Sequence, residues 1–338
     1  MGAVDPRDAA AVAEVLRQRL SARWGEVRVA EPPSSVGAGF DSYIHLVRLE
    51  GDELPPQWSV PLVVRLLPSR DREPQSHHEA AAQGWAGSVG YRAPLVLDVI
   101  GPDDGFGLPA QVMERAPGTT MLDALKAKPW RAVHLVDQLA RLQLELHALP
   151  VDAWPGDGDV SALFDQRLGM PRRAAAALGN DDLAEALARA EDLRAVASGG
   201  PLVVCHGDFH PLNVMVSGEE ASVIDWTDAG LGPREGDVAR TRLLFHIASI
   251  AAEGRVEKAA LRVVGPRLAN RYWLSYTAAV PLDPERMRAW EALHALHGWA
   301  QVLTLHAGGF AGQSSSDEGR IPLEVGDFLR ARFEAALA

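Results

Sequence analysis

The sequence predicts an α+β protein of two lobes, the first rich in strands and the second mainly helical. Its 338 residues suit two lobes better than one compact core. Short β-type apolar runs recur up to residue 113, and Pro117-Gly118 then interrupts the pattern. After that break, apolar residues recur at helical spacing.

The first lobe is expected to begin with a helix and to continue with strands. Apolar side chains recur at helical spacing between residues 6 and 24, at Val12, Val15, Leu16 and Leu20. Strand-like runs follow at residues 27–36, 42–49, 60–67, 95–100 and 108–113. Between the first two runs, Gly37 and Gly39 predict a turn whose backbone N–H groups could approach phosphates. Two glycines in a hairpin are, however, often just a turn.

Two charged residues of this lobe stand out. Arg65 lies inside an apolar run, so its charge needs a partner, or else it faces solvent on an edge strand. Glu79 follows in a helix-like stretch, where the sequence alone reads it as a surface residue of a helix.

The second lobe is expected to be helical around one strand-rich segment. Leucines 135, 139, 142, 146 and 149 alternate steps of four and three, which predicts one apolar stripe on a long helix. An Ala-rich helical region covers residues 161–197. Short apolar runs at 202–205, 214–216 and 221–224 predict strands that carry the intervening loop in a hairpin-like frame. The chain then becomes largely helical, interrupted by a Gly/Ser-rich loop at 308–319.

That loop carries the most informative motif, His206-Gly207-Asp208-Phe209-His210-Pro211-Leu212-Asn213, with Asp225 after the next strands. Protein kinases use this order of Asp, Asn and Asp for a catalytic base and two metal ligands. One carboxylate must face the acceptor hydroxyl, and Mg²⁺ prefers hard oxygen ligands on the phosphates. Each residue alone also fits an ordinary turn. The ordered set, between strands, favours kinase chemistry.

At these residues the chain resembles the aminoglycoside phosphotransferase family, a branch of the protein-kinase-like fold. The family signature, H-G-D-x-H-x-x-N followed by I-D-W or I-D-F, is complete here. The resemblance implies a bilobal fold: a small antiparallel-sheet N-lobe that binds nucleotide, residues 1–115, and a larger helical C-lobe, residues 116–338, with the catalytic loop and acceptor site. It implies Asp208 as base, Mg²⁺ on Asn213 and Asp225, and ATP or GTP as co-substrate.

The resemblance also suggests roles for residues around the nucleotide. Arg65 takes the position of the cation, more often Lys, that binds the phosphates, and Glu79 takes the position of its helix partner. The Pro-Gly break resembles the family's hinge, so the Glu114 carbonyl and the Ala116 N–H are expected to hold the base. An interdomain turn without a ligand would have the same sequence pattern.

Two further residues are expected to support the loop rather than to react. Gly236-Asp237-Val238-Ala239-Arg240 resembles the family's G-D-x-A-R segment, whose Asp braces the catalytic loop, so Asp237 receives that role. His206 opens the loop and is treated likewise. A zinc site on His206 and His210 is disfavoured because Gly207 and Pro211 argue against one continuous helix.

Composition narrows the class of partner. The net charge of −12 argues against nucleic acid, which requires a basic face. It is compatible with a cationic substrate, and equally with solubility alone. Cys205 is the single cysteine, which favours a reducing, cytoplasmic compartment. No apolar run suggests a membrane span or a signal peptide, and the oligomeric state, a homodimer included, stays open.

The acceptor is predicted only by class. An aminoglycoside-like hydroxylated molecule is favoured, bound in the second lobe near residues 257–310, with a role in antibiotic resistance or in metabolism. A macrolide or a metabolite is the alternative, because Gly39-Phe40-Asp41 and Asp225-Trp226-Thr227-Asp228-Ala229 resemble macrolide phosphotransferases. An inactive kinase-like nucleotide-binding protein is a third reading, which the intact base and metal ligands disfavour.

Overall fold

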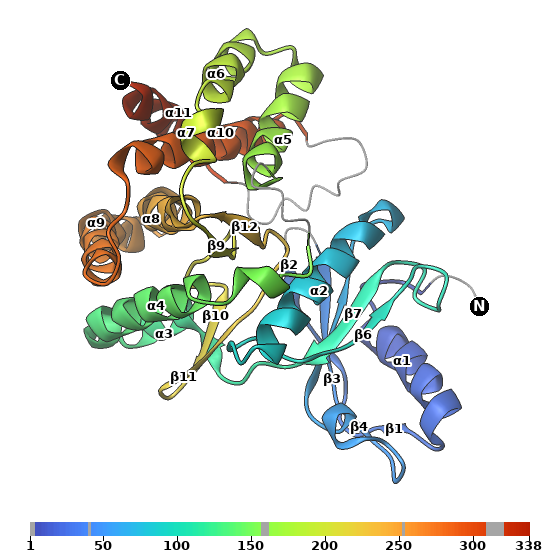
Figure 1. Ribbon diagram of the computed structural model, residues 1–338. Helices are drawn as coiled ribbons and strands as arrows, with labels where there is room; N and C mark the ends of the chain where they lie inside the picture. The colour runs from blue at the N-terminus through green and yellow to red at the C-terminus, as the bar shows by residue number, and fades with distance from the viewer. Residues whose placement is uncertain (1–3, 40–41, 157–161, 252–253, 309–320) are drawn as a thin grey trace. The chain divides into compact units, whose positions relative to one another are not determined.

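The computed structural model describes residues 4–39, 42–156, 162–251, 254–308 and 321–338, which form two compact units. The first unit comprises Met1–Thr119 together with Met215–Thr227, and the second comprises Thr120–Val214 and Asp228–Ala338. Figure 1 labels the elements of both units. A segment from the middle of the chain therefore completes the strand-rich first unit.

The first unit is built on a five-stranded antiparallel sheet. Its order is β2 (Ser34–Gly39), β3 (Ser42–Val47), β5 (Leu62–Leu66), β7 (Ala110–Glu114) and β6 (Val96–Ile100). A separate two-stranded sheet pairs β1 (Arg28–Val29) with β4 (Leu49–Glu50). The predicted strand at 27–36 is thus wrong as one element. Pro32 and Pro33 fix the backbone and lack N–H donors, which divides it.

Helices cover the two faces of this sheet, α1 (Ala9–Trp24) on one and α2 (Glu73–Ser88) on the other. Side chains alternate along β5. Leu62, Val64 and Leu66 are buried in one core with the apolar stripe of α1. Arg65 points to the other face, where it meets Glu79 of α2. The expected amphipathic first helix is confirmed, and Arg65 lies on the central strand rather than on an edge.

The second unit is mainly helical, and its long helices pack around α10, with α4 against α9. Its helices are α3 (Met121–Ala127), α4 (Ala132–His147), α5 (Ala162–Leu178), α6 (Asp181–Glu191), α7 (Arg194–Ala197), α8 (Arg234–Ala251), α9 (Arg255–Thr277), α10 (Pro284–His306) and α11 (Leu323–Leu337). Short 3-10 turns lie at Pro56–Trp58, Arg70–Arg72, Pro129–Arg131 and Val151–Ala153.

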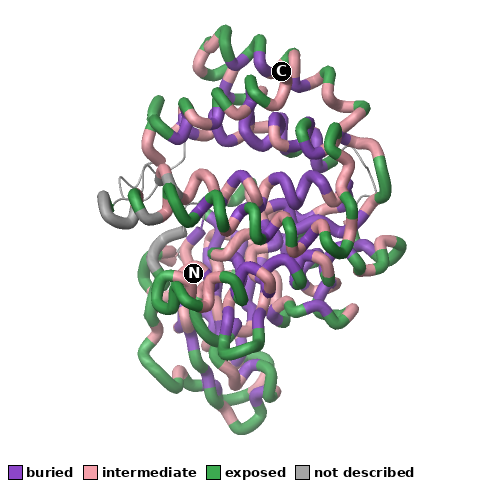
Figure 2. Tube along the Cα trace, turned by 90° about the vertical axis from the view of Figure 1, so that its left-hand side faces the viewer, coloured by how far each residue is buried: buried purple, intermediate pink, exposed green. Residues whose placement is uncertain are grey.

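Burial follows the predicted periodicity. The leucine stripe of α4 is buried at positions 135, 139, 142 and 146, while residue 149 lies beyond the helix end. Figure 2 shows buried segments running through the interiors and exposed residues on the outer turns. No helix among the described residues has the length and apolarity to cross a membrane.

The strands around the signature loop differ from the expected hairpin-like frame. β9 (Leu202–Cys205) precedes the loop and pairs with β12 (Gly230–Pro233). β10 (Val214–Ser217) follows the loop and lies beside β11 (Glu220–Val223) and β8 (Thr119–Thr120). The strand before the loop and the strand after it therefore belong to different sheets. The sequence did not predict β12, because Gly and Pro are depleted in strands.

Candidate active site

In the second unit, both carboxylate oxygens of Asp208 are bound by cationic or polar side chains. Arg240 of α8 donates from Nε to Oδ1 at 2.9 Å, and its Nη2 forms an ion pair with the same oxygen at 2.9 Å. The Nε2 atom of His210 lies 3.1 Å from Oδ2. Because the N–H of Leu212 donates to Nδ1 of His210 at 3.2 Å, the ring proton sits on Nε2 and points to Asp208.

This environment determines the charge of Asp208. Burial alone would raise its pKa, but the positive charge of Arg240 and the hydrogen bond from His210 outweigh burial. The pKa of Asp208 therefore lies well below its usual range, and the group is a carboxylate at neutral pH. It can accept a hydrogen bond from a hydroxyl group, but it is a weak base.

Asn213 closes the loop back onto Asp208. Its Nδ2 donates to the Asp208 carbonyl at 3.0 Å, and its backbone N–H donates to the His210 carbonyl at 2.9 Å. The amide nitrogen is thus engaged within the loop. No hydrogen bond from a described residue reaches the amide oxygen, which is the atom a hard cation would bind.

Asp237 holds the start of the loop from α8. Its carboxylate accepts hydrogen bonds from the N–H of His206 at 3.1 Å and of Gly207 at 2.7 Å. His147 donates from Nε2 to the same carboxylate at 3.1 Å, and Tyr276 lies 2.5 Å from the other ring nitrogen. Burial raises the pKa of Asp237, yet the hydrogen bond from His147 and its charge lower it to about 2.

The loop also needs a glycine at its second position. Gly207 has φ +79, and a Cβ atom there would lie 2.3 Å from the Asp228 carbonyl oxygen. Arg167 donates to the Gly207 carbonyl at 2.6 Å and to the Asp228 carboxylate at 2.8 Å. The backbone of Asp228 therefore runs too close to the loop for any side chain.

In the first unit, Arg65 contacts four residues that are distant in sequence. Its Nη1 contacts Glu79 and lies 3.4 Å from Oδ1 of Asp225. Its Nη2 lies 3.5 Å from Oγ1 of Thr227, and its Nε donates to Ser42 at 3.1 Å. The sequence singled out Arg65, Glu79 and Asp225, while the contacts of Thr227 and Ser42 with Arg65 become visible only in the fold.

The electrostatics of this cluster are unusual. Glu79 is 1% exposed, and burial together with the charge of Asp225 raises its pKa to about 7 despite the opposing charge of Arg65. Asp225 is 42% exposed and has φ +64, a left-handed conformation that is uncommon for a residue with a side chain. Such positions recur at functional sites.

The remaining predicted nucleotide residues lie elsewhere in the first unit. Glu114 ends β7, and Ala116 follows it as a buried residue. Gly37 and Gly39 belong to β2, at the hairpin with β3, whose tip at 40–41 lies outside the described residues.

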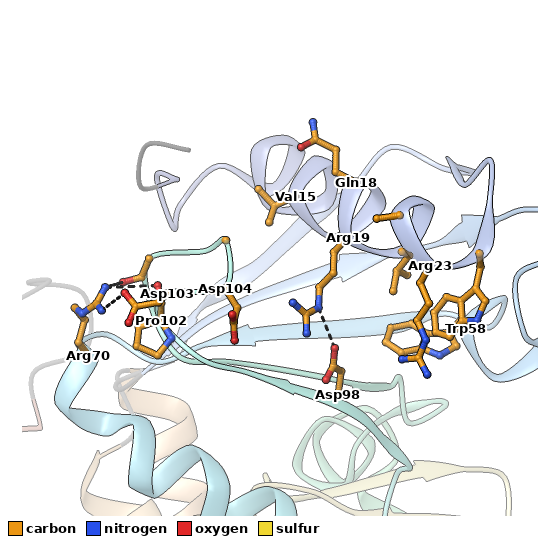
Figure 3. Close-up of a pocket in the computed structure, with 15 residues that line it drawn as sticks. Val15, Gln18, Arg19, Arg23, Trp58, Arg70, Asp98, Pro102, Asp103 and Asp104 are labelled. Atoms are coloured by element: carbon orange, nitrogen blue, oxygen red, sulfur yellow. Dashed lines mark hydrogen bonds and ion pairs between the residues drawn. The ribbon is translucent and has the colours of Figure 1, made fainter.

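A cavity of about 850 Å³ in the first unit contains none of the predicted residues (Figure 3). It lies between α1 and the turn after β6. Arg19 pairs with Asp98 across it at 3.1 Å, and Arg70 pairs with Asp103 at 2.5 Å. The charged side chains of this cavity are largely paired with each other, and Arg65 does not line it. The cavity is therefore not the predicted phosphate site.

Comparison with protein families identifies the chain. Residues 37–290 match the profile named APH, the phosphotransferase enzyme family, which is three-quarters of the sequence. The chain belongs to this family. It is therefore a small-molecule phosphotransferase that acts on a hydroxyl group, as the sequence predicted. No curated protein matched the sequence.

Solved structures support the same fold. A crystal structure of aminoglycoside phosphotransferase APH(4)-Ia matches with a TM-score of 0.60 at 15% identity, covering 96% of this chain and 98% of the other. A choline/ethanolamine kinase family protein from Mesorhizobium loti matches at 0.55 and 18% identity, covering 96% and 94%. An aminoglycoside-3'-phosphotransferase of type VIII matches at 0.57 and 22%, covering 84% and 98%. The predicted kinase-like fold of this phosphotransferase is confirmed.

Proposed function

We propose that the phosphotransferase moves the γ-phosphate of ATP or GTP to a hydroxyl group of a small acceptor, with Asp208 as the base. The observation that carries this role is the ionised Asp208 carboxylate, held by Arg240 and His210. Phosphoryl transfer has a loose transition state, so orienting the hydroxyl matters more than strong proton abstraction. A carboxylate of low pKa suits orientation followed by late proton acceptance.

Mg²⁺ fits the donors that the chain offers. Asn213 offers its amide oxygen, and Asp225 offers Oδ2, which no hydrogen bond from a described residue reaches. Both are hard oxygen donors of the kind Mg²⁺ prefers. When bound, the ion would neutralise charge on the phosphates. In this proposal Asp237 and His206 keep the loop in place.

The first unit would bind the nucleotide. Arg65, paired with Glu79, would bind the phosphates. The Glu114 carbonyl and the Ala116 N–H would hold the base. Gly37 and Gly39 would lie over the phosphates. A thermostable mutant of APH(4)-Ia was solved as a ternary complex with AMP-PNP and hygromycin B, which supports a nucleotide and a small hydroxylated acceptor as partners. We keep the proposed assignment of nucleotide binding to the lobe at 1–115 and of catalysis and acceptor binding to the lobe at 116–338.

An aminoglycoside-like acceptor is the first candidate, and antibiotic resistance would be its context. The family and the net charge of −12 support a cationic acceptor. We place its binding in the second unit, between the catalytic loop and the helices at 257–310. Polyamine cations would need several carboxylates that are not already neutralised.

A neutral acceptor, such as a macrolide or a metabolite, is the second candidate, and one observation favours it. Carboxylates near the loop and on the helices that support it pair with arginine. Asp208 pairs with Arg240; the other pairs are Asp228–Arg167 at 2.8 Å, Glu291–Arg242 at 3.0 Å and Glu235–Arg286 at 3.4 Å. A polycation would have to compete with these arginines.

An acceptor screen tests the proposal. Purified protein is incubated with γ-labelled ATP or GTP, MgCl₂ and panels of aminoglycosides, macrolides and small alcohols, and transferred label is separated from free phosphate. Labelled acceptor in at least one panel, lost without Mg²⁺, is the expected result. Label in no acceptor together with no Mg²⁺-dependent nucleotide binding would contradict the proposal.

A further inference from the structure

The cluster around Arg65 contains a hydroxyl group that touches every charged member. Oγ1 of Thr227 lies 2.8 Å from Oδ1 of Asp225 and 3.1 Å from Oε2 of Glu79. It also lies 3.5 Å from Nη2 of Arg65. Among the described residues, Thr227 thus contacts the cation and both carboxylates.

The shape of the cation makes this arrangement specific. A guanidinium is a planar fork with five donors, whereas an ammonium is a single point with three. Arg65 directs separate nitrogens to separate partners: Nε to Ser42, Nη1 to Glu79 and Asp225, and Nη2 to Thr227. A lysine at this position could not reach the same set.

Thr227 also determines how Asp225 presents its carboxylate. The hydroxyl contact and the Arg65 contact both use Oδ1. The other oxygen, Oδ2, receives no hydrogen bond from a described residue. Asp225 has φ +64, so its backbone is in a conformation that neighbouring contacts must stabilise. A hydrogen bond two residues away is the nearest such contact.

We infer that Thr227 is a positioning residue: its hydroxyl holds the Arg65 guanidinium, Glu79 and the Asp225 carboxylate in one arrangement and directs Oδ2 of Asp225 toward the cation that accompanies the nucleotide. This inference rests on the proposed function. Ser42 is the companion residue, and within this cluster its hydroxyl accepts a hydrogen bond from Arg65. The two hydroxyl groups should therefore affect different parts of nucleotide binding.

The test compares AMP-PNP binding by calorimetry in MgCl₂ and in EDTA. Thr227→Val removes the hydroxyl and keeps the shape, and Thr227→Ser restores it. The ratio of the EDTA dissociation constant to the Mg²⁺ dissociation constant should fall about 10-fold or more in Thr227→Val, the range for a lost hydrogen bond to a charged group. Thr227→Ser should keep the wild-type ratio.

Two controls isolate the effect. Thr304→Val removes another buried hydroxyl, which donates to the Ala300 carbonyl at 2.8 Å within α10, and should leave the ratio unchanged. Ser42→Ala should weaken AMP-PNP binding equally with and without Mg²⁺. Thermal unfolding shows whether each variant folds, and Thr227→Ala replaces Thr227→Val if the valine does not fit.

The outcomes separate the two proposals. If wild type shows the Mg²⁺-dependent ratio and Thr227→Val keeps it, the positioning role is wrong while the proposed function stands. If wild type binds AMP-PNP with no Mg²⁺ dependence, the metal role in the proposed function fails, and this inference fails with it.

Discussion

At the scale of single residues, the contacts of Asp208 favour a role in orienting the acceptor hydroxyl over a role as a strong base. Arg240 and His210 keep its pKa low, so its carboxylate is present throughout the neutral range. A base so weak gains little by abstracting a proton early. In the proposed mechanism it would instead fix the acceptor hydroxyl in line with the phosphate, and such positioning can lower a reaction barrier by several kcal/mol.

Replacing this carboxylate gives the first prediction. Asp208→Asn should lower kcat by about 10²–10⁴-fold, because the amide cannot take the proton, while the nucleotide Kd stays near wild type. The matched control is Asp165→Asn, which removes a carboxylate paired with Arg194 at 2.8 Å on α5. Steady-state kinetics and nucleotide titration measure both variants. A folded Asp208→Asn enzyme with wild-type turnover would remove Asp208 from the mechanism.

The local sequence pattern reveals those parts of the site that lie close together along the chain, while Arg65 and Glu79 received their roles from the family resemblance. Asp208 and Asn213 stand five residues apart in one loop, so a local pattern reveals them. The contact of Thr227 with Arg65 spans 162 residues, and that of Arg240 with Asp208 spans 32. Such contacts depend on how the elements pack, which no local spacing encodes.

At the scale of elements, the difference between local patterns and long-range contacts explains which strands the sequence predicted. The sheet of the first unit follows from alternating apolar runs, and those runs were visible. β12 contains Gly230, Gly232 and Pro233, so its pairing with β9 depends on the partner strand rather than on its own preference. This pairing returns the chain beside the loop, where the Asp228 carbonyl meets Gly207.

The second prediction concerns that contact. Gly207→Ala should lower the free energy of unfolding by about 3 kcal/mol or more, because the new methyl group clashes with backbone and the left-handed conformation is strained. Gly218→Ala is the control: Gly218 has φ +66, but nothing lies within 4 Å of its Cβ position. It should cost about 1–2 kcal/mol. Urea denaturation measures both, and equal losses would show that the close approach is unimportant.

Helix α10 carries the third prediction, which concerns pH. His294 and His297 hydrogen-bond to the carbonyls of Gly236 and Arg167 at 2.8 and 2.9 Å. Burial, followed by the charge of Arg167, lowers the pKa of His297 from 6.5 to about 4 and holds that of His294 well below its usual range. The folded state thus binds fewer protons than the unfolded state between pH 6.5 and 4.

Stability should therefore be fully present above pH 6.5 and fall as the pH drops toward 4, by about 1–3 kcal/mol for His297. His297→Gln removes the titrating group and should flatten this decline, whereas His306→Gln, exposed on the same helix, should not. Urea unfolding at half-unit pH intervals measures the slope. An unchanged slope in His297→Gln would show that another group causes the acid sensitivity.

At the scale of the whole molecule, overall charge and local charge lead to different expectations for the acceptor. The net charge of −12 would attract a polycation from a distance. Near the catalytic loop, however, carboxylates pair with arginines, including Asp228 with Arg167 and Glu291 with Arg242. Long-range attraction is screened within about 10 Å at 0.1 M salt, so the local pairs decide binding.

The last prediction follows from this contrast. If the local pairs decide in favour of the second candidate, a neutral acceptor, its KM should change less than about twofold between 0.05 and 0.5 M NaCl, since a neutral molecule held by apolar and hydroxyl contacts is little affected by screening. A polycation held by carboxylates would instead show a KM that rises severalfold over this range. The nucleotide is kept saturating at every salt concentration, so that only the acceptor term varies. A steep rise, reduced by Asp228→Asn, would exclude the neutral acceptor and support the aminoglycoside-like one.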